Sequence, residues 1–332
     1  MAFFQRKHGN TFEMKPTKDT ISSEKKNRLR QVFLLVLILV SLGFVAAQIF
    51  QGHQELANRH WEISAWKFIC SLGLLMVNFL FTAIAWSVIF DSLGQPISVL
   101  RSFAVVFVSA IGRYIPGKIW MVLGQISVAA KWNYKSSTVL TAGAVHIFCG
   151  ALGASLVFIA TTIAMGQMSW MTGLVALFFA FGLLTLLAAP SFLEKWINKI
   201  RSKKGGEPIC LRVSPAAVFK VTGIMTAVWV INCVAFALLV ASLTSVGPDA
   251  WLDLAYAFNL AYWAGFAILI LPGGIGVREG VLTLLLTGPL GPAGAGIVAL
   301  CQRLWLLLAE LIAFGVATII YKRDHKPPLS EP

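Results

Sequence analysis

The sequence predicts an all-α polytopic membrane protein with about six crossing helices and two re-entrant helical hairpins, arranged as an inverted-topology repeat. Of its 332 residues, 58% are hydrophobic and only 12% are charged, a balance that excludes an ordinary soluble domain. Several apolar stretches reach the roughly 20 residues that a membrane-crossing helix needs. Two apolar regions are interrupted by glycine, proline and charged residues, which predicts short helices that enter the membrane and turn back.

The candidate spans are separated by short polar segments. They are residues 31–50, 68–90, 138–165, 168–189, 215–243, 251–271 and 293–320. The chain then divides into a basic N-terminal arm (1–30), a first membrane half (31–189), a basic loop (190–214), a second membrane half (215–320) and a tail (321–332).

Basic residues gather in the segments outside these spans. The formal net charge is +13; residues 1–30 contain eight Lys and Arg against three Asp and Glu, and residues 190–214 contain six against two. Such an excess beside apolar helices is typical of cytoplasmic segments, so we prefer this interpretation to nucleic-acid binding. We expect both termini and the loop in the cytoplasm, an uncleaved first helix at 31–50, and a bacterial cytoplasmic (inner) membrane as the location.

The first interrupted region is residues 101–130, with "SAIGRYIPGKIW" at its centre. Charge places both of its ends on the cytoplasmic side, and each apolar limb has only 11 or 12 residues, enough for about half a bilayer. We therefore predict a re-entrant hairpin. Its break is formed by Gly112, Pro116 and Gly117.

The second interrupted region is residues 251–287, with "LPGGIGVREG" in its interior. The same reasoning places both of its ends outside the cell, which predicts a hairpin of opposite orientation, although its first limb is long enough to span. Its break residues are Pro272, Gly273, Gly274 and Gly276. Interrupted helices at corresponding places of two halves indicate a transporter's binding site.

Charged residues accompany both breaks. The candidate binding residues are Arg113, Tyr114, Lys118, Arg278, Glu279, Arg303 and Glu310. Charges within a membrane are costly and usually face a pathway or pair with one another. Internal pairing is one alternative, for example Arg278 with Glu310 or Arg303 with Glu279. The other is an anionic guest such as a lipid phosphate, which the four cations against two anions favour.

No motif of enzymatic or metal chemistry stands out. The five cysteines are scattered without CxxC spacing, and the sequence contains no Walker loop, HExxH or GxSxG. We therefore expect no metal, no cofactor, no catalytic residues and no enzymatic activity.

The segments "GRYIPGKIW", "LPGGIGVREG" and "CQRLW" resemble the membrane region of lysylphosphatidylglycerol synthases, which also occurs as a free-standing flippase-like family. The resemblance covers about residues 30–320. It implies movement of anionic or modified lipids between leaflets, and some relatives are tied to polyprenyl-linked sugars. The motif positions that it implies are Arg113, Pro116, Gly117, Lys118, Pro272, Gly273, Gly276, Arg278, Glu279 and Arg303. The synthases continue into a soluble aminoacyl-transfer domain, and this chain ends at Pro332, so we expect no aminoacylation by that route.

Three hypotheses follow for the function. The first is a flippase or scramblase that moves an anionic phospholipid or polyprenyl-phosphate lipid, with Glu279 or Glu310 available for proton coupling. The second is a membrane enzyme acting on a lipid phosphate. The third is a non-catalytic subunit that recruits a cytoplasmic glycosyltransferase or lipid synthase through the loop 190–214.

Overall fold

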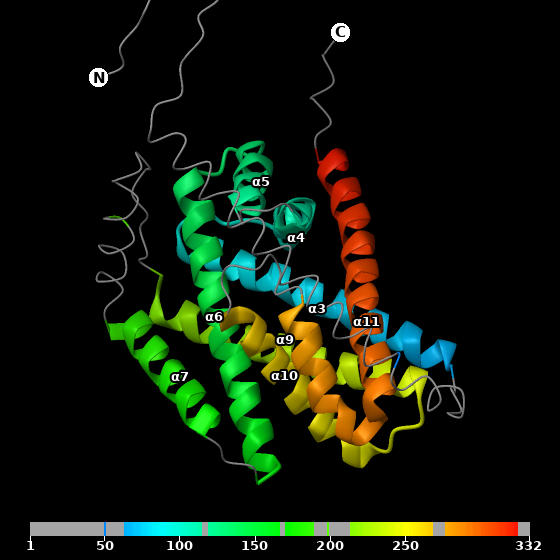
Figure 1. Cartoon of the computed structure of the whole chain (residues 1–332). Helices are drawn as coiled ribbons and strands as arrows, with labels where there is room; N and C mark the ends of the chain where they lie inside the picture. Colours follow the sequence, from blue (N-terminus) through cyan, green and yellow to red (C-terminus); the bar gives the residue numbers. More distant parts are fainter. Residues whose placement is uncertain are drawn as a thin grey trace, which may run out of the picture.

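The structure is a computed structural model of the chain, and it describes residues 50, 63–114, 119–166, 170–188, 198, 213–267 and 276–324. The predicted arm and first helix lie outside this part except for Phe50, as do nearly all of the loop 190–214 and the end of the tail. The described residues form helices and no strand. The helices are α3 (Ala65–Ser92), α4 (Val99–Val108), η1 (Ala110–Tyr114), α5 (Ile119–Ala130), α6 (Ser136–Ala164), α7 (Trp170–Ala188), α9 (Pro215–Leu243), η2 (Pro248–Ala250), α10 (Trp251–Ala267) and α11 (Val277–Arg323) (Figure 1).

Four of the described helices are long and apolar enough to cross a membrane, namely α3, α6, α9 and α11. They correspond to the predicted spans 68–90, 138–165, 215–243 and 293–320. The sequence therefore predicted the fold class correctly: the protein is an all-helical, polytopic integral membrane protein.

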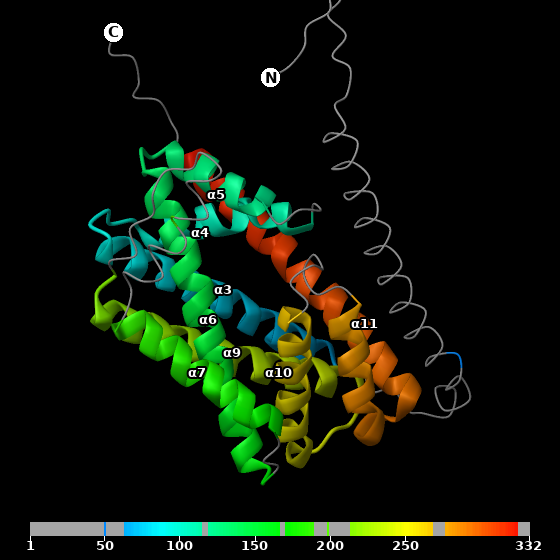
Figure 2. The same cartoon turned by 60° about the vertical axis from the view of Figure 1, so that its left-hand side comes forward.

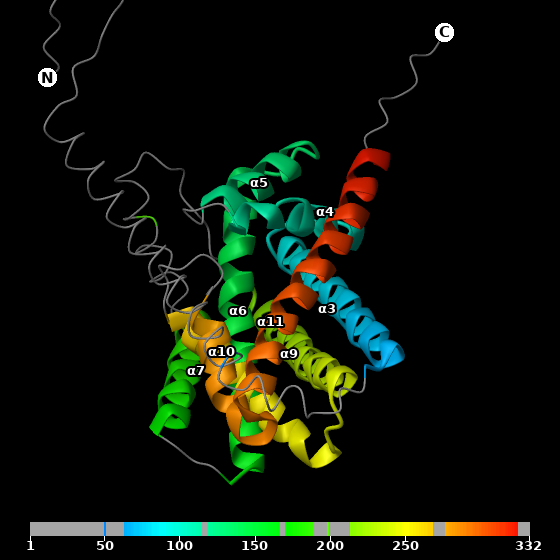
Figure 3. The same ribbon diagram turned by 45° about the vertical axis from the view of Figure 1, so that its right-hand side comes forward.

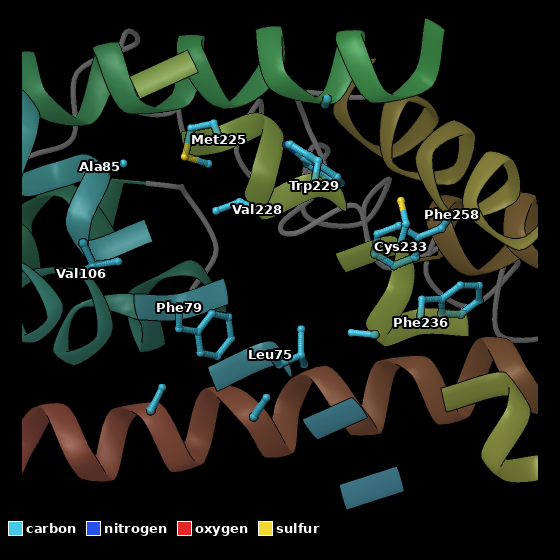
Figure 4. Packing of buried hydrophobic residues seen from close by; sticks show 14 of the residues in the cluster. Leu75, Phe79, Ala85, Val106, Met225, Val228, Trp229, Cys233, Phe236 and Phe258 are labelled. Atoms are coloured by element: carbon cyan, nitrogen blue, oxygen red, sulfur yellow. The ribbon is translucent and has the colours of Figure 1, made fainter. Parts of the chain in front are cut away.

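The centre of the molecule is the antiparallel pair α3 and α9. The Nδ2 of Asn78 donates to the Val228 carbonyl at 2.9 Å, and near the other end of the pair the Ser64 amide donates to the Ser242 carbonyl at 2.9 Å. Apolar side chains fill the space between the two helices, among them Leu75 and Phe79 of α3 and Val228 of α9 (Figure 4).

Helix α6 crosses α9 in close contact. A Cβ added at Gly153 would lie 2.8 Å from the backbone of Met225, so only glycine lets the two backbones approach this far. The indole Nε1 of Trp229 donates to the Gly150 carbonyl at 2.9 Å and fixes the same crossing. The short helices α4 and α5 lie toward one end of α6, and α7 and α10 lie toward the other (Figure 2).

Helices α4 and α5 form a tight antiparallel pair. A Cβ at Gly112 would lie 2.5 Å from the Met121 amide nitrogen, and one at Gly124 would lie 2.9 Å from the Cβ of Ser109. Their lengths of 10 and 12 residues match the two limbs predicted in 101–130. The end of α11 reaches this pair: Arg101 on α4 forms an ion pair of 2.5 Å with Asp324, and Figure 3 shows the two helices meeting there.

Helix α11 is one run of 47 residues that is divided by a kink. The backbone is non-helical at Gly291, with φ 70° and ψ 164°, and Pro289 and Pro292 flank it. Proline removes a backbone donor and clashes with the preceding turn, which explains why the kink lies here. The kink lies between residues 287 and 293, where the sequence predicted the boundary between the second hairpin and the last span.

Candidate functional site

Glu279 fixes the start of α11 in two ways. Gly276 precedes the helix with φ 93° and ψ −53°, a conformation that L-residues with a side chain rarely adopt. Its amide donates to Glu279 Oε2 at 2.6 Å, which satisfies one of the free donors at the helix N-terminus. Glu279 Oε1 lies 3.7 Å from a guanidinium nitrogen of Arg303, on the far side of the kink. This pair is one of the two internal pairings that the sequence allowed.

Arg278, the residue before Glu279, contacts an aromatic ring of the neighbouring helix α10. Its guanidinium carbon is 5.0 Å from the centre of the Phe258 ring on α10, a cation–π arrangement. Its Nε is buried and has no hydrogen-bond partner in the described part of the chain. Arg278 also interacts electrostatically with Glu279, Arg303 and Glu310, so all four predicted charges of the second half belong to one cluster.

Aromatic side chains of α10 form the wall beside this cluster. Tyr262 lies against Trp229 at 4.2 Å between ring centres, and Trp263 lies against Phe178 of α7 at 5.3 Å. The indole Nε1 of Trp263 is buried and lacks a hydrogen-bond partner among the described residues. Figure 4 shows Phe258 beside Cys233 and Phe236 of α9, which anchors this wall to the core.

Phe258 was not among the residues that the sequence singled out. The signal was present, since Phe258, Tyr262 and Phe266 follow one another every four residues and so share one face of α10. The spacing could not predict that this face contacts Arg278, because the contact joins two separate helices.

The first break is described only in part. Gly112, Arg113 and Tyr114 belong to η1, at the end of α4. The side chains of Arg113 and Tyr114 and the whole of Pro116, Gly117 and Lys118 lie outside the described residues, as do Pro272, Gly273 and Gly274 of the second break. The described cluster contains two cations and two carboxylates, so the surplus of cations predicted from the sequence depends on Arg113 and Lys118.

The described ranges contain no group of three or more His, Cys, Asp or Glu side chains that could hold a metal ion. The cluster offers two guanidinium groups beside aromatic rings and two carboxylates, with the side chain of Arg303 23% exposed. Such a setting can bind an oxyanion, and it can equally stabilise the helix arrangement.

The helices and this cluster define an integral membrane protein that holds Arg and Glu side chains inside its helical bundle. The family model described as "Lysylphosphatidylglycerol synthase TM region" matches residues 31–313, and the chain belongs to this family. No curated protein and no solved structure matches the chain. The resemblance seen in the sequence is thus confirmed, and membership indicates a lipid-related function in the membrane.

Proposed function

We propose that this protein moves an anionic phospholipid or a polyprenyl-phosphate-linked lipid between the leaflets of the bacterial cytoplasmic membrane, without covalent chemistry of its own. One observation carries the proposal: the buried Nε of Arg278 has no hydrogen-bond partner in the described part of the chain. A buried charged donor without a partner costs free energy, and a phosphate oxygen is the acceptor that guanidinium geometry suits best.

The neighbouring charges favour transient rather than permanent binding. Arg303 supplies a second guanidinium close to Arg278. Glu279 and Glu310 both act on Arg278, and Glu279 also pairs with Arg303. A carboxylate beside each cation reduces the net attraction for a phosphate. Movement across a membrane requires this balance, because a headgroup must enter the site and also leave it.

The arrangement of helices supports a path for the headgroup. We assign α4, η1 and α5 to a re-entrant hairpin of the first half, and α10 with the part of α11 before Gly291 to one of the second half, in inverted orientation. Broken helices at corresponding positions place backbone groups and charges near the middle of the bilayer. The acyl or prenyl tails would stay in lipid while the headgroup passes Arg278.

The test is leaflet exchange in proteoliposomes with fluorescent phosphatidylglycerol, measured by reduction of the outer-leaflet label. Wild type should exchange the lipid, Arg278→Ala should lower the rate about tenfold or more, as expected for loss of one charge-assisted hydrogen bond, and Lys220→Ala, which removes an exposed cation of α9, should match wild type. Equal rates for wild type and Arg278→Ala would refute the assigned site. No exchange of phosphatidylglycerol, cardiolipin or polyprenyl phosphate would favour a lipid-phosphate enzyme or a recruiting subunit instead.

A further inference from the structure

A cavity of about 410 Å³ lies between α3, α4, α5 and α6, in the first half of the protein. It shares no lining residue with the cluster around Arg278, which is built on α10 and α11. The cavity is therefore a second candidate site, and binding there does not depend on the proposed function.

The described lining contains no Lys, Arg, Asp or Glu. Placing a charged ligand in such a space would cost its hydration without an opposite charge to replace it. The lining is not purely apolar, however, because two amide side chains face it, Asn78 of α3 and Gln125 of α5, together with the hydroxyl-bearing Thr82. The cavity thus suits a ligand that is neutral and still forms hydrogen bonds.

Trp86 lines the cavity and carries a donor that no described residue uses. The residue is only 1% exposed, and its indole Nε1 is buried without a hydrogen-bond partner among the described residues. Asn78 uses its Nδ2 for the Val228 carbonyl, which leaves its side-chain oxygen to accept from a ligand. A donor and an acceptor are therefore present, and Gln125 can act as either.

Aromatic rings form the rest of the recognition surface. The rings of Trp86 and His146 lie 5.9 Å apart between centres, and those of Phe79 and Phe107 lie 4.7 Å apart. Flat aromatic faces combined with a few amide and indole groups bind compact ligands that carry both C–H and O–H surfaces. We propose that the cavity binds an uncharged hydroxylated group, such as the glycerol or hexose part of a lipid headgroup or the same group free in solution.

Gly143 offers a direct way to fill the cavity. A Cβ there would lie at ordinary contact distances, 3.7 Å from Gln125 Oε1 and 3.9 Å from a ring carbon of Trp86. Alanine should therefore fit without rearrangement, although Leu at this position would extend among the groups that we assign to the ligand. The pair Gly143→Ala and Gly143→Leu thus separates the effect of a blocked cavity from that of losing a glycine.

The experiment measures the binding of four probes to the full-length protein in nanodiscs of phosphatidylcholine. They are glycerol, glucose, a monoglucosyl diacylglycerol and the same diacylglycerol without sugar. We expect saturable binding of at least one hydroxylated probe to wild type and Gly143→Ala, its loss in Gly143→Leu, and about tenfold weaker binding in Trp86→Phe, since one hydrogen bond is lost. Binding of the glucosyl lipid alone would identify a headgroup as the source, and binding of free glycerol or glucose would identify a soluble ligand.

The proposal is overturned if no hydroxylated probe binds wild type, or if Trp86→Phe and Gln125→Leu bind the probe as wild type does. These two variants keep the cavity open, so they decide the question even where Gly143→Leu does not fold. A competition measurement with phosphatidic acid gives a further test. If phosphatidic acid binds more tightly than the glucosyl lipid, and Trp86→Phe abolishes its competition, the ligand of this cavity is not neutral and the proposal is contradicted.

Discussion

Individual residues stabilise the start of α11, and single substitutions can test the contact that each one makes. Glu279 accepts a hydrogen bond from the Gly276 amide and pairs with Arg303, and it is 5% exposed. Its carboxylate thus joins the helix N-terminus to the segment beyond the kink. A carboxylate near the N-terminus of a helix is also favoured by the helix dipole.

Replacing Glu279 should weaken the fold in a graded manner. We expect Glu279→Ala to lower the free energy of unfolding by about 2–3 kcal/mol, because a charge-assisted hydrogen bond and a buried counter-charge are lost together. Glu279→Gln keeps an acceptor for the Gly276 amide and should cost less. Unfolding in mixed micelles measures both, with Asp91→Asn on the exposed end of α3 as the control. An unchanged stability of Glu279→Ala would contradict this role.

The backbone at Gly276 allows a sharper comparison. Gly276→Ala should destabilise the protein by about 1–2 kcal/mol, because a side chain is strained at φ 93°. Gly280→Ala, one turn later in the same helix, should be neutral or stabilising by up to about 1 kcal/mol, since nothing lies within 4 Å of the added Cβ. The midpoint of thermal unfolding should therefore fall in Gly276→Ala and stay equal or rise in Gly280→Ala. A shift of the same size in both variants would mean that the left-handed backbone at Gly276 is not the reason for the effect.

At the scale of elements, the crossing of α6 and α9 determines how the two halves meet. Gly153→Ala should cost about 1–3 kcal/mol, because its Cβ would lie 2.8 Å from backbone atoms of Met225 and Thr226. Gly150→Ala on the same helix is the matched control, since its Cβ would lie 3.6 Å from the flexible end of Met225. We expect its unfolding midpoint to stay within about 1 kcal/mol of wild type. Equal losses in the two variants would show that the close approach at Gly153 is not the reason for the effect.

The sequence predicted the helices better than it predicted their contacts. It placed spans at 138–165 and 215–243, and the helices are Ser136–Ala164 and Pro215–Leu243. Composition suffices for this, and local chemistry sharpens the start of α9, where Ser214 Oγ accepts from the Ala217 amide and proline follows. The close approach at Gly153 and the contact of Arg278 with Phe258 join distant segments, so no local pattern specifies them.

The candidate site shows the same division. Charged residues in apolar segments are energetically costly, and this was enough to select Arg278, Glu279, Arg303 and Glu310 from the sequence. The structure brings these four residues together. The cavity beside Trp86 could not be predicted, because its lining comes from four helices and includes no charged residue. Its amides and aromatic rings look like ordinary core residues along the chain.

At the scale of the whole molecule, the inverted repeat that we propose predicts which side of the membrane gives access to each hairpin. With the native cysteines replaced, Ile111→Cys in η1, just after α4, should react with a membrane-impermeant maleimide from the cytoplasmic side. Val277→Cys at the start of α11 should react from the external side, because the proposed hairpins have opposite orientations. Right-side-out and inside-out vesicles provide the comparison. Reaction of both cysteines from one face alone would exclude the inverted arrangement.

The end of α11 also connects the two halves. Arg101 of α4 pairs with Asp324 and lies 5.6 Å from the Trp132 ring, whereas Lys131 lies over Tyr321 at 4.4 Å. The ion pair is exposed, so we expect Asp324→Asn to change the free energy of unfolding by less than about 1 kcal/mol in the same assay. A larger loss would show that this contact anchors α11 to the first half.

The central claim is that a lipid phosphate completes the hydrogen bonding of Arg278, and the most direct measurement is ¹⁵N–³¹P dipolar dephasing by solid-state NMR. The protein would carry labelled arginine Nε and be placed in phosphatidylglycerol bilayers, with Arg278→Lys as the comparison. We expect a dephased arginine signal in wild type that is absent from the Arg278→Lys spectrum, because one guanidinium then no longer faces phosphorus. Identical dephasing in the two proteins would contradict the claim, and the cluster would be assigned to holding α10 and α11 together.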